Sequence, residues 1–159
     1  MEWKRDNFTI TTELAEFDMD FVAASLQSTW RKSASRKRIQ DAFANSLCFG
    51  LFDGTKQVGF VRAVTDRRFV SWVCDLFLDP TYRGKKLGEW LMEGVKNHPD
   101  LVQTRLVFSS VPEFQAFYER IGFKPMERGY SMRPRSTEQH ARQASSEAAP
   151  STSPDEPPA

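Results

Sequence analysis

A strand, a basic loop and a helix follow one another between residues 69 and 97, and this unit constrains the fold most. Its first part is an apolar run, rich in aromatic and β-branched residues, that stops at Asp79-Pro80 and is typical of a buried strand. After the loop, apolar residues and one glycine recur with helical spacing at Leu87, Trp90, Leu91, Gly94 and Val95. The unit therefore predicts a helix that packs on one face of a sheet.

The loop between strand and helix, residues 83–88, is suited to binding an anion. The first amides of a helix have no partner within the helix, and the helix dipole places partial positive charge there. Arg83, Lys85 and Lys86 add full positive charges, so the expected ligand is a phosphate or a pyrophosphate. The loop is neither G-x-G-x-x-G nor G-x-x-x-x-G-K-[ST], and a Rossmann or P-loop site is not supported. A solvated turn is the alternative.

Two segments resemble the hallmarks of the GNAT N-acetyltransferase superfamily. Residues Leu76–Gly88 are similar to its acetyl-CoA motif, in which a strand ends near Asp-Pro and Arg/Gln-x-x-Gly-x-Gly/Ala follows. Residues Phe117–Phe123 are similar to its second motif, a helix that ends in Tyr-Glu-(Lys/Arg)-(Leu/Ile)-Gly-Phe. The two motifs occur in the right order, and the resemblance extends over most of residues 1–133. The chain departs from the pattern at Lys86, where the first glycine of the pair is usual.

The resemblance implies an α/β fold, the GNAT fold, with a central mixed and mostly antiparallel twisted sheet of about six to seven strands flanked by about four helices. It also implies an N-acetyltransferase that transfers the acetyl group of acetyl-CoA to a primary amine by direct attack. A small-molecule amine is favoured over a protein lysine or N-terminus, because the single domain carries no evident targeting module. A non-catalytic acyl-CoA-binding module, supported by Lys86 in the glycine position, is a further alternative. The resemblance leaves room for a homodimer.

The same resemblance assigns the contacts to acetyl-CoA. Backbone groups at the end of the strand would bind the thioester oxygen and the pantetheine arm, provided that the next strand splays away as it does in the family. The loop and the first helical turn would bind the pyrophosphate. The predicted cofactor-binding residues are Leu76, Phe77, Leu78, Arg83, Gly84, Lys85, Lys86, Leu87, Gly88 and Glu89.

Tyr118 is the predicted acid, because its position matches the tyrosine of the second motif. A phenol with a pKa near ~10 can donate a proton to the departing thiolate while it stays protonated at neutral pH. The alternative is a packing role for Tyr118 on the helix face that includes Phe114.

Asp75 is the predicted base, as the only acid inside the apolar strand. A carboxylate there is costly to bury unless it is paired or lines a water-filled groove. It could accept a proton from the ammonium substrate or anchor its positive charge, and a salt bridge with Arg62 is the alternative. Strict alternation places Asp75 on the face of Val73 and Phe77, although a bulge in the strand would change this.

The preceding part of the chain predicts two helices and three strands. Strands are expected at residues 8–11, 47–52 and 58–64, with a hairpin turn at 53–56. One helix should run from the N-cap Asp18 to about Ser28, and a second should continue from the basic segment 30–38 to Asn45. The basic segment is either a docking site for an acidic substrate or for the nucleotide phosphate, or a solvated helix face.

The part of the chain after the helix predicts a strand at residues 104–108 and a short helix behind it. His98 is expected to be an exposed residue at a helix end, and Ser110–Glu113 reads as a capping box. The short helix should bury Phe114, Phe117 and Ile121 and end at Gly122. Residues 123–132 would supply the last strands.

Composition limits the partners and the compartment. Residues 1–133 hold 20 basic and 17 acidic residues, because segment 134–159 contains two of the 22 basic and four of the 21 acidic residues. This excess is too small to argue for nucleic acid. Cys48 and Cys74 are expected to be buried thiols in a reducing compartment, and two histidines offer no metal-ligand cluster. Neither a signal peptide nor a membrane span is evident, so we expect a cytoplasmic protein without a membrane partner.

The composition changes abruptly at Pro134. Residues 134–159 contain five of the nine prolines and no aromatic or aliphatic side chain larger than Ala. Such a segment cannot bury enough apolar surface to offset the conformational entropy of ordering it. The sequence therefore predicts a GNAT domain at residues 1–133 and a disordered tail at 134–159.

Overall fold

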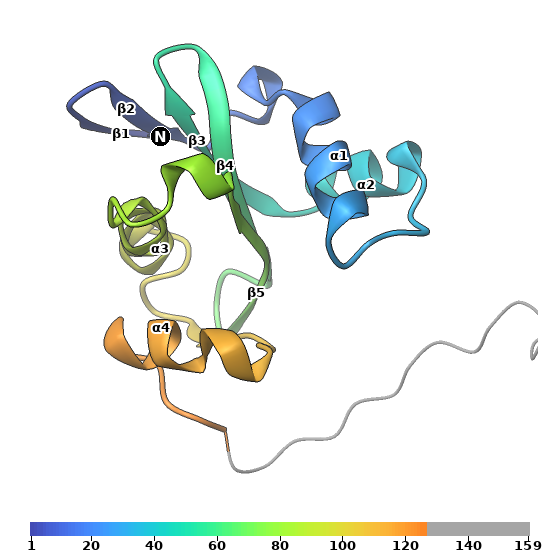
Figure 1. The fold of residues 1–159 in the computed structure, drawn as a ribbon. Helices are drawn as coiled ribbons and strands as arrows, with labels where there is room; N and C mark the ends of the chain where they lie inside the picture. Colours follow the sequence, from blue (N-terminus) through green and yellow to red (C-terminus); the bar gives the residue numbers. More distant parts are fainter. Residues whose placement is uncertain (127–159) are drawn as a thin grey trace, which may run out of the picture. The chain divides into compact units, whose positions relative to one another are not determined.

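A six-stranded sheet organises residues 1–126, the part of the chain that the computed structural model describes (Figure 1). The strands lie side by side in chain order: β1 (Glu2–Arg5), β2 (Phe8–Thr11), β3 (Leu47–Asp53), β4 (Lys56–Thr65), β5 (Val70–Leu78) and β6 (Arg105–Val107). Neighbouring strands from β1 to β5 are antiparallel, and β6 is parallel to β5. The predicted mixed, mostly antiparallel sheet is confirmed. β1 was not predicted, because Trp3 is its only apolar residue.

The last predicted elements lie largely beyond this description. Residues 123–126 form no strand, and the remainder of the predicted last strands and the whole predicted tail, 127–159, lie outside the described residues. Within residues 1–126, no helix is long and apolar enough to cross a membrane.

Helices cover both faces of the sheet. α1 (Met19–Ser28) and α2 (Arg36–Ala44) lie on one face, and α3 (Leu87–Asn97) lies on the other (Figure 1). The core under α1 and α2 is a cluster of eight buried side chains: Phe17, Val22, Ala23, Leu26, Ile39, Phe43, Cys48 and Phe60. Each large member contributes about 1.5–3 kcal/mol through burial.

The predicted inner face of α3 is confirmed. Leu87, Trp90, Leu91 and Val95 are buried. Gly94 faces the sheet, where a Cβ atom added to it would lie 3.8 Å from the side chain of Ile10, in ordinary van der Waals contact. This packing fixes the start of α3 beside the end of β5.

Of the two predicted helix caps, one is present in the structure and one is not. Asp18 caps α1 as predicted, accepting hydrogen bonds of 3.0 Å from the amides of Asp20 and Phe21. The predicted capping box at Ser110–Glu113 is wrong. A 3₁₀ turn (Pro112–Phe114) begins after Val111 without a side-chain cap, and Ser110 Oγ donates to the Val111 carbonyl instead. α4 is consequently short, Gln115–Arg120.

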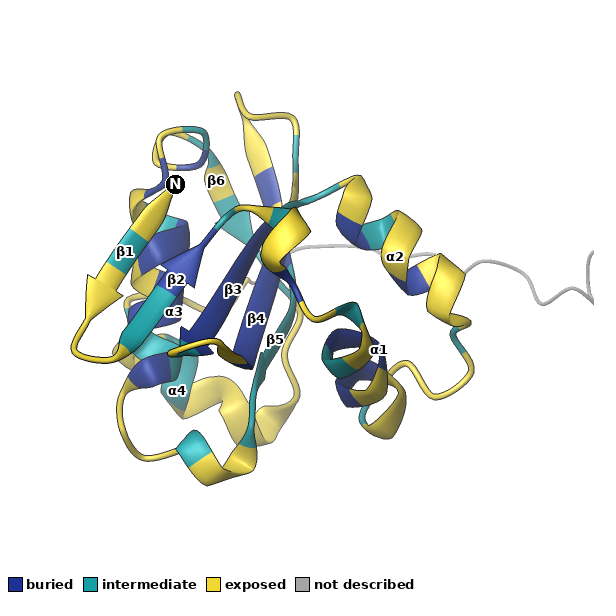
Figure 2. Ribbon diagram, turned by 90° about the horizontal axis from the view of Figure 1, so that it is seen from above, coloured by how far each residue is buried: buried dark blue, intermediate teal, exposed yellow. Residues whose placement is uncertain are grey.

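Burial corrects two further expectations. The strand β5 exists, but Phe69 just before it is 81% exposed, and Val70 and Trp72 are exposed as well, so this end of the strand is not buried. Figure 2 shows buried residues concentrated in β3 and β4, with intermediate burial in β5. His98 was expected to be exposed but is buried, because Trp3 and Phe49 pack around its ring.

β5 contains a bulge at Asp75. Phe60 of β4 lies opposite Phe77, whereas Arg62, two residues further on, lies opposite Cys74. β5 therefore has one extra residue in this interval, and Asp75 adopts a left-handed backbone with φ of 54°. Strict alternation does not hold across the bulge, and Asp75 shares the α1/α2 face with Cys74 and Phe77.

Candidate functional site

The loop before α3 presents a row of unpaired backbone amides. Within residues 1–126, no acceptor is found for the amides of residues 84–89, and the first helical bond runs from the Trp90 amide to the Lys86 carbonyl, at 3.1 Å. Gly84 has a φ of +79°, and a Cβ atom added to it would meet nothing within 4 Å. The loop is thus an open cradle of donors at a helix N-terminus, which suits an anion.

Neighbouring side chains hold this loop in place. The Asp79 carboxylate accepts from the Thr81 amide at 2.9 Å and from Thr81 Oγ1 at 2.7 Å, and these two bonds lower the pKa of Asp79. The Tyr82 hydroxyl donates to Asp53 Oδ2 at 3.1 Å, which ties the loop to the turn between β3 and β4. Arg83 and Lys86 form no ion pair with any described residue and are exposed, so the cradle is electropositive.

Lys86 occupies a conformation that favours glycine. It is the N-cap of α3 and has a left-handed backbone, with φ of 58° and ψ of 16°. A left-handed conformation costs an L-residue about 1–2 kcal/mol. Glycine adopts this conformation without strain, which gives a physical reason why glycine is usual at this position. A lysine here bears the energetic cost.

The sheet opens between β5 and β6. The parallel pairing joins only Val70, Ser71 and Trp72 to β6 and ends at the pair Trp72–Val107. From Val73 to Leu78, β5 has no neighbouring strand on that side within the described part of the chain. The backbone groups on that edge are free for a ligand that runs alongside the strand.

α4 packs against the start of α3 and brings the two sequence motifs together. A Cβ atom on Gly88 would lie 3.7 Å from the Phe117 ring, so the helix α3 approaches this ring closely. Arg120 Nε donates to Glu89 Oε1 at 2.9 Å, and Lys96 Nζ donates to the Ile121 carbonyl at 3.1 Å. The carboxylate of Glu89, a predicted cofactor residue, is therefore engaged by α4.

Tyr118 lies on this short helix and is partly buried. Its ring centroid is 3.9 Å from that of Phe108 and 5.1 Å from that of Phe117. Phe114, by contrast, is 50% exposed and was predicted to be buried. Burial raises the pKa of Tyr118, so its hydroxyl stays protonated at neutral pH and retains a proton to donate.

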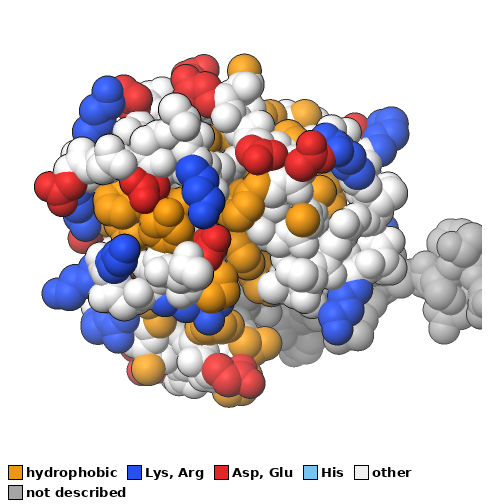
Figure 3. Space-filling model, turned by 45° about the horizontal axis from the view of Figure 1, so that its top comes forward, with side chains coloured by type: hydrophobic (Ala, Val, Ile, Leu, Met, Phe, Trp, Pro, Cys, Tyr) orange, Lys and Arg blue, Asp and Glu red, His pale blue; other side chains and the backbone are white. Residues whose placement is uncertain are grey.

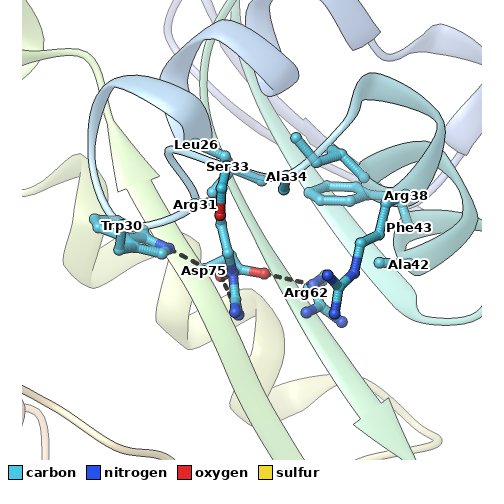
Figure 4. A pocket seen from close by; sticks show the side chains of 11 residues that line it. Leu26, Trp30, Arg31, Ser33, Ala34, Arg38, Ala42, Phe43, Arg62 and Asp75 are labelled. Atoms are coloured by element: carbon cyan, nitrogen blue, oxygen red, sulfur yellow. Dashed lines mark hydrogen bonds and ion pairs between the residues drawn. The ribbon is translucent and has the colours of Figure 1, made fainter. Parts of the chain in front are cut away.

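Asp75 is surrounded by hydrogen-bond donors (Figure 4). Its Oδ2 accepts from Arg62 Nε at 2.6 Å, and its Oδ1 accepts from Trp30 Nε1 at 2.9 Å and from Arg31 Nη2 at 3.1 Å. The Asp75 side chain is 3% exposed. Burial works to raise its pKa, but the charge of Arg62, the Trp30 hydrogen bond and the charge of Arg31 together lower the pKa below its usual range. The salt bridge considered as an alternative is thus present.

A cavity of about 350 Å³ lies beside Asp75, between α1, α2 and the strands β4 and β5. Trp30, Arg31, Arg38 and Arg62 contribute its polar lining. The predicted basic segment therefore borders a cavity at both of its ends, through Trp30 and Arg31 and through Arg38, whereas Lys37 pairs with Asp41 on the surface. The sequence placed Trp30 in the basic segment, but its hydrogen bond to Asp75 was not predicted, because no local pattern distinguishes it from an ordinary surface tryptophan.

The face of the molecule in Figure 3 shows no extended basic patch of the kind that binds nucleic acid. Figure 3 shows Lys and Arg side chains intermingled with Asp and Glu on the displayed face, without a field of one sign. Among the residues described, no group of three or more His, Cys, Asp and Glu side chains could hold a metal ion, and Cys48 and Cys74 are free thiols.

The chain is similar to proteins of one family. Residues 12–133 match the family described as Acetyltransferase (GNAT) domain. A protein of Gibberella zeae described as an acetyltransferase is 25% identical over 147 residues, which cover 77% of this chain and 82% of that protein. A crystal structure from Xanthomonas campestris pv. campestris, assigned to the GNAT family, is 29% identical with a TM-score of 0.71 and covers 77% of this chain and 93% of its own.

More distant structures share the fold. The aminoglycoside N-acetyltransferase AAC(6')-Iy in complex with CoA is 14% identical, with a TM-score of 0.62, over 81% of this chain and 94% of that one. At this identity the likeness concerns the fold alone.

Proposed function

The chain belongs to the GNAT acetyltransferase family, and we propose that it transfers the acetyl group of acetyl-CoA to a primary amine of a small molecule. In this reaction the bond between the carbonyl carbon and the amine nitrogen forms and the bond to sulfur breaks. The amine loses a proton, and the departing thiolate gains one. The observation that carries the proposal is the row of acceptor-free amides at residues 84–89, which lies beside the open edge of β5.

The residues of the loop fit the pyrophosphate of acetyl-CoA. Backbone amides at a helix N-terminus bind phosphate oxygens, and Arg83, Lys85 and Lys86 supply compensating charge. Gly84 leaves open space where a side chain would stand, so an anion can approach the backbone there. A CoA complex of an enzyme with the same fold gives further support.

The edge of β5 fits the rest of the cofactor. When bound, acetyl-CoA supplies an acetyl group activated as a thioester. The backbone of Leu76, Phe77 and Leu78 lies on the unpaired edge, where an amide can donate to the carbonyl oxygen as it gains negative charge. The same edge can pair with the amide groups of the pantetheine arm as an added strand would.

Tyr118 is the proposed donor to the thiolate, since its phenol stays protonated at neutral pH. Asp75 remains the predicted base, but its hydrogen bonds weigh against that role. A carboxylate that accepts from Arg62, Trp30 and Arg31 has a lowered pKa and holds a proton poorly at neutral pH. We therefore favour Asp75 as a positioning residue that fixes these three side chains around the acceptor.

The preference for a small molecule rests on the cavity. Its volume of about 350 Å³ is at the low end of the range of about 300–1,000 Å³ typical of small-molecule sites. The alternatives are a protein lysine or N-terminus. CoA release measured on a panel of small amines and on lysine-containing peptides distinguishes them, and turnover of the peptides alone would contradict the proposal.

Binding of the cofactor is tested separately. Calorimetric titration of acetyl-CoA into the full chain is expected to give a micromolar dissociation constant, and dephospho-CoA serves as the comparison ligand. No binding at millimolar acetyl-CoA would contradict the assignment of the loop.

A further inference from the structure

The cavity beside Asp75 carries more positive than negative charge. Three guanidinium groups, of Arg31, Arg38 and Arg62, line it together with a single carboxylate, that of Asp75. Figure 4 shows the side chains of Arg38, Arg62 and Asp75 pointing into the same space. An amine with no other charged group would enter this cavity as a cation and would be repelled by the surplus positive charge.

The hydrogen bonds show which donors are unused. Asp75 is occupied by Arg62 and Arg31. Arg62 Nη1 donates to Ser46 Oγ at 3.0 Å, and Nη2 has no acceptor among the described residues. Arg62 is only 9% exposed, but no buried side-chain nitrogen or oxygen of the described residues lacks a hydrogen-bond partner, so Nη2 is in contact with solvent and accessible to an oxyanion, to which it can donate a charge-assisted bond.

Arg38 is the second unused donor. Its neighbours on α2 have acidic partners outside the cavity, Arg36 with Asp20 and Lys37 with Asp41. Arg38 has no acidic partner and no side-chain hydrogen bond in the described part of the chain, although it faces the cavity. Its guanidinium can therefore offer two parallel N–H groups to an oxyanion.

We propose that the acceptor amine also carries an acidic group, a carboxylate or a phosphate, and that Arg38 and Arg62 Nη2 bind this group. This inference rests on the proposed function. The acidic group offsets the surplus positive charge, which removes the repulsion of the ammonium.

Matched pairs of amines test the inference. We expect kcat/KM, from CoA release, to be about 10- to 100-fold higher for β-alanine than for β-alanine amide, or for O-phosphoethanolamine than for ethanolamine. The first pair differs by a carboxylate and the second by a phosphate, so the larger ratio of kcat/KM shows which acidic group is preferred. Equal or faster turnover of β-alanine amide and ethanolamine would overturn the inference while leaving the acetyltransferase proposal standing.

The variant Arg38→Gln tests whether Arg38 binds the acidic group, and Lys37→Gln is its matched control. Both remove one charge from α2, but the Lys37 side chain lies outside the cavity. Arg38→Gln is expected to raise KM for the acidic amine about 10-fold or more, whereas kcat/KM for amines without an acidic group should not fall, because one of the charges that repel them is removed. An equal loss in both variants, or an equal loss for both kinds of amine, would contradict specific recognition by Arg38.

Binding gives a readout that does not require turnover. O-phosphoethanolamine and β-alanine are titrated into the full chain saturated with CoA, beside ethanolamine and β-alanine amide, which lack the acidic group. Binding of the acidic members that weakens in Arg38→Gln supports the inference. Absence of binding by both acidic probes at millimolar concentration overturns it, whereas failure of acetyl-CoA itself to bind would contradict the proposed function instead.

Discussion

Arg62 Nε lies 2.6 Å from Asp75 Oδ2, and this ion pair joins the middle of β4 to the bulge of β5. Both side chains are nearly inaccessible, with exposed fractions of 11% for Arg62 and 3% for Asp75. The bulge turns Asp75 toward the cavity, and the arginine holds it there. Much of the predicted acceptor site thus depends on one buried pair.

Asp75→Asn should cost about 3–5 kcal/mol of unfolding free energy, because it leaves the buried Arg62 charge without its counterion. Urea denaturation measures this loss. Asp20→Asn is the control, because its exposed pair with Arg36 should contribute less than about 1 kcal/mol. Equal losses in the two variants would show that the buried pair does not stabilise the fold.

The same Asp75→Asn variant separates a base from a positioning residue. If Asp75 positions its neighbours, kcat falls but the acidic limb of the pH–rate profile stays where it is. If it removes the proton from the amine, this limb disappears. The lowered pKa of Asp75 favours the first result. Any interpretation requires that the variant be folded at the assay temperature, which the urea curve establishes.

Lys86→Gly tests the departure from the family pattern. Glycine relieves the left-handed strain of about 1–2 kcal/mol but adds entropy to the unfolded chain, so we expect stability to change by less than about 1 kcal/mol. Loss of the ammonium should weaken acetyl-CoA binding about 3- to 10-fold at low salt and less at high salt. Lys86→Ala is the control, since it removes the charge and keeps the strain. Unchanged affinity in both variants would show that Lys86 does not contact a phosphate.

Local signals in the sequence were sufficient for most elements. The turn at residues 53–56, the cap at Asp18 and the inner face of α3 are encoded by residues within a few positions of one another. The family motifs located the loop in the same way. The burial of Phe114 was predicted wrongly, because it would have required a longer helix and another element packed over the Phe114 side chain.

Long-range relationships could not be predicted. Trp30 and Asp75 are 45 positions apart, and nothing in either neighbourhood specifies their hydrogen bond. The bulge depends on how β4 and β5 pair. Alternation alone places Asp75 on the same face as Val73, whereas the bulge places it on the other face. The burial of His98 depends on Trp3 from a strand that was not predicted.

Tyr118→Phe should lower kcat about 100-fold or more if the phenol protonates the thiolate. The ring contact with Phe108 is retained in this variant, so KM for acetyl-CoA should change little. Steady-state kinetics with one acceptor at varied acetyl-CoA concentration provide the measurement. A kcat within twofold of the parent enzyme would assign Tyr118 to packing.

His98 should make stability depend on pH. Burial lowers the pKa of His98 in the folded protein, whereas the unfolded chain keeps the usual value of 6.5. Between these two values the unfolded state binds more protons, so the unfolding free energy should fall as the pH drops below about 6.5, with a slope of at most about 1.4 kcal/mol per pH unit. The loss should level off once the folded state also takes up the proton.

His98→Asn isolates this contribution, because its side-chain oxygen can still accept from the Asp100 amide that His98 Nδ1 binds at 3.1 Å. The variant should be less stable at pH 8, since it loses the ring contacts with Phe49 and Trp3, but its stability should change less between pH 8 and pH 5. Urea curves at several pH values measure both quantities. Carboxyl groups with lowered pKa values, such as Asp75 and Asp79, lose their stabilising charge only below about pH 4, so they do not contribute between pH 8 and pH 5. An unchanged dependence of the unfolding free energy on pH in the variant would therefore contradict the assignment to His98.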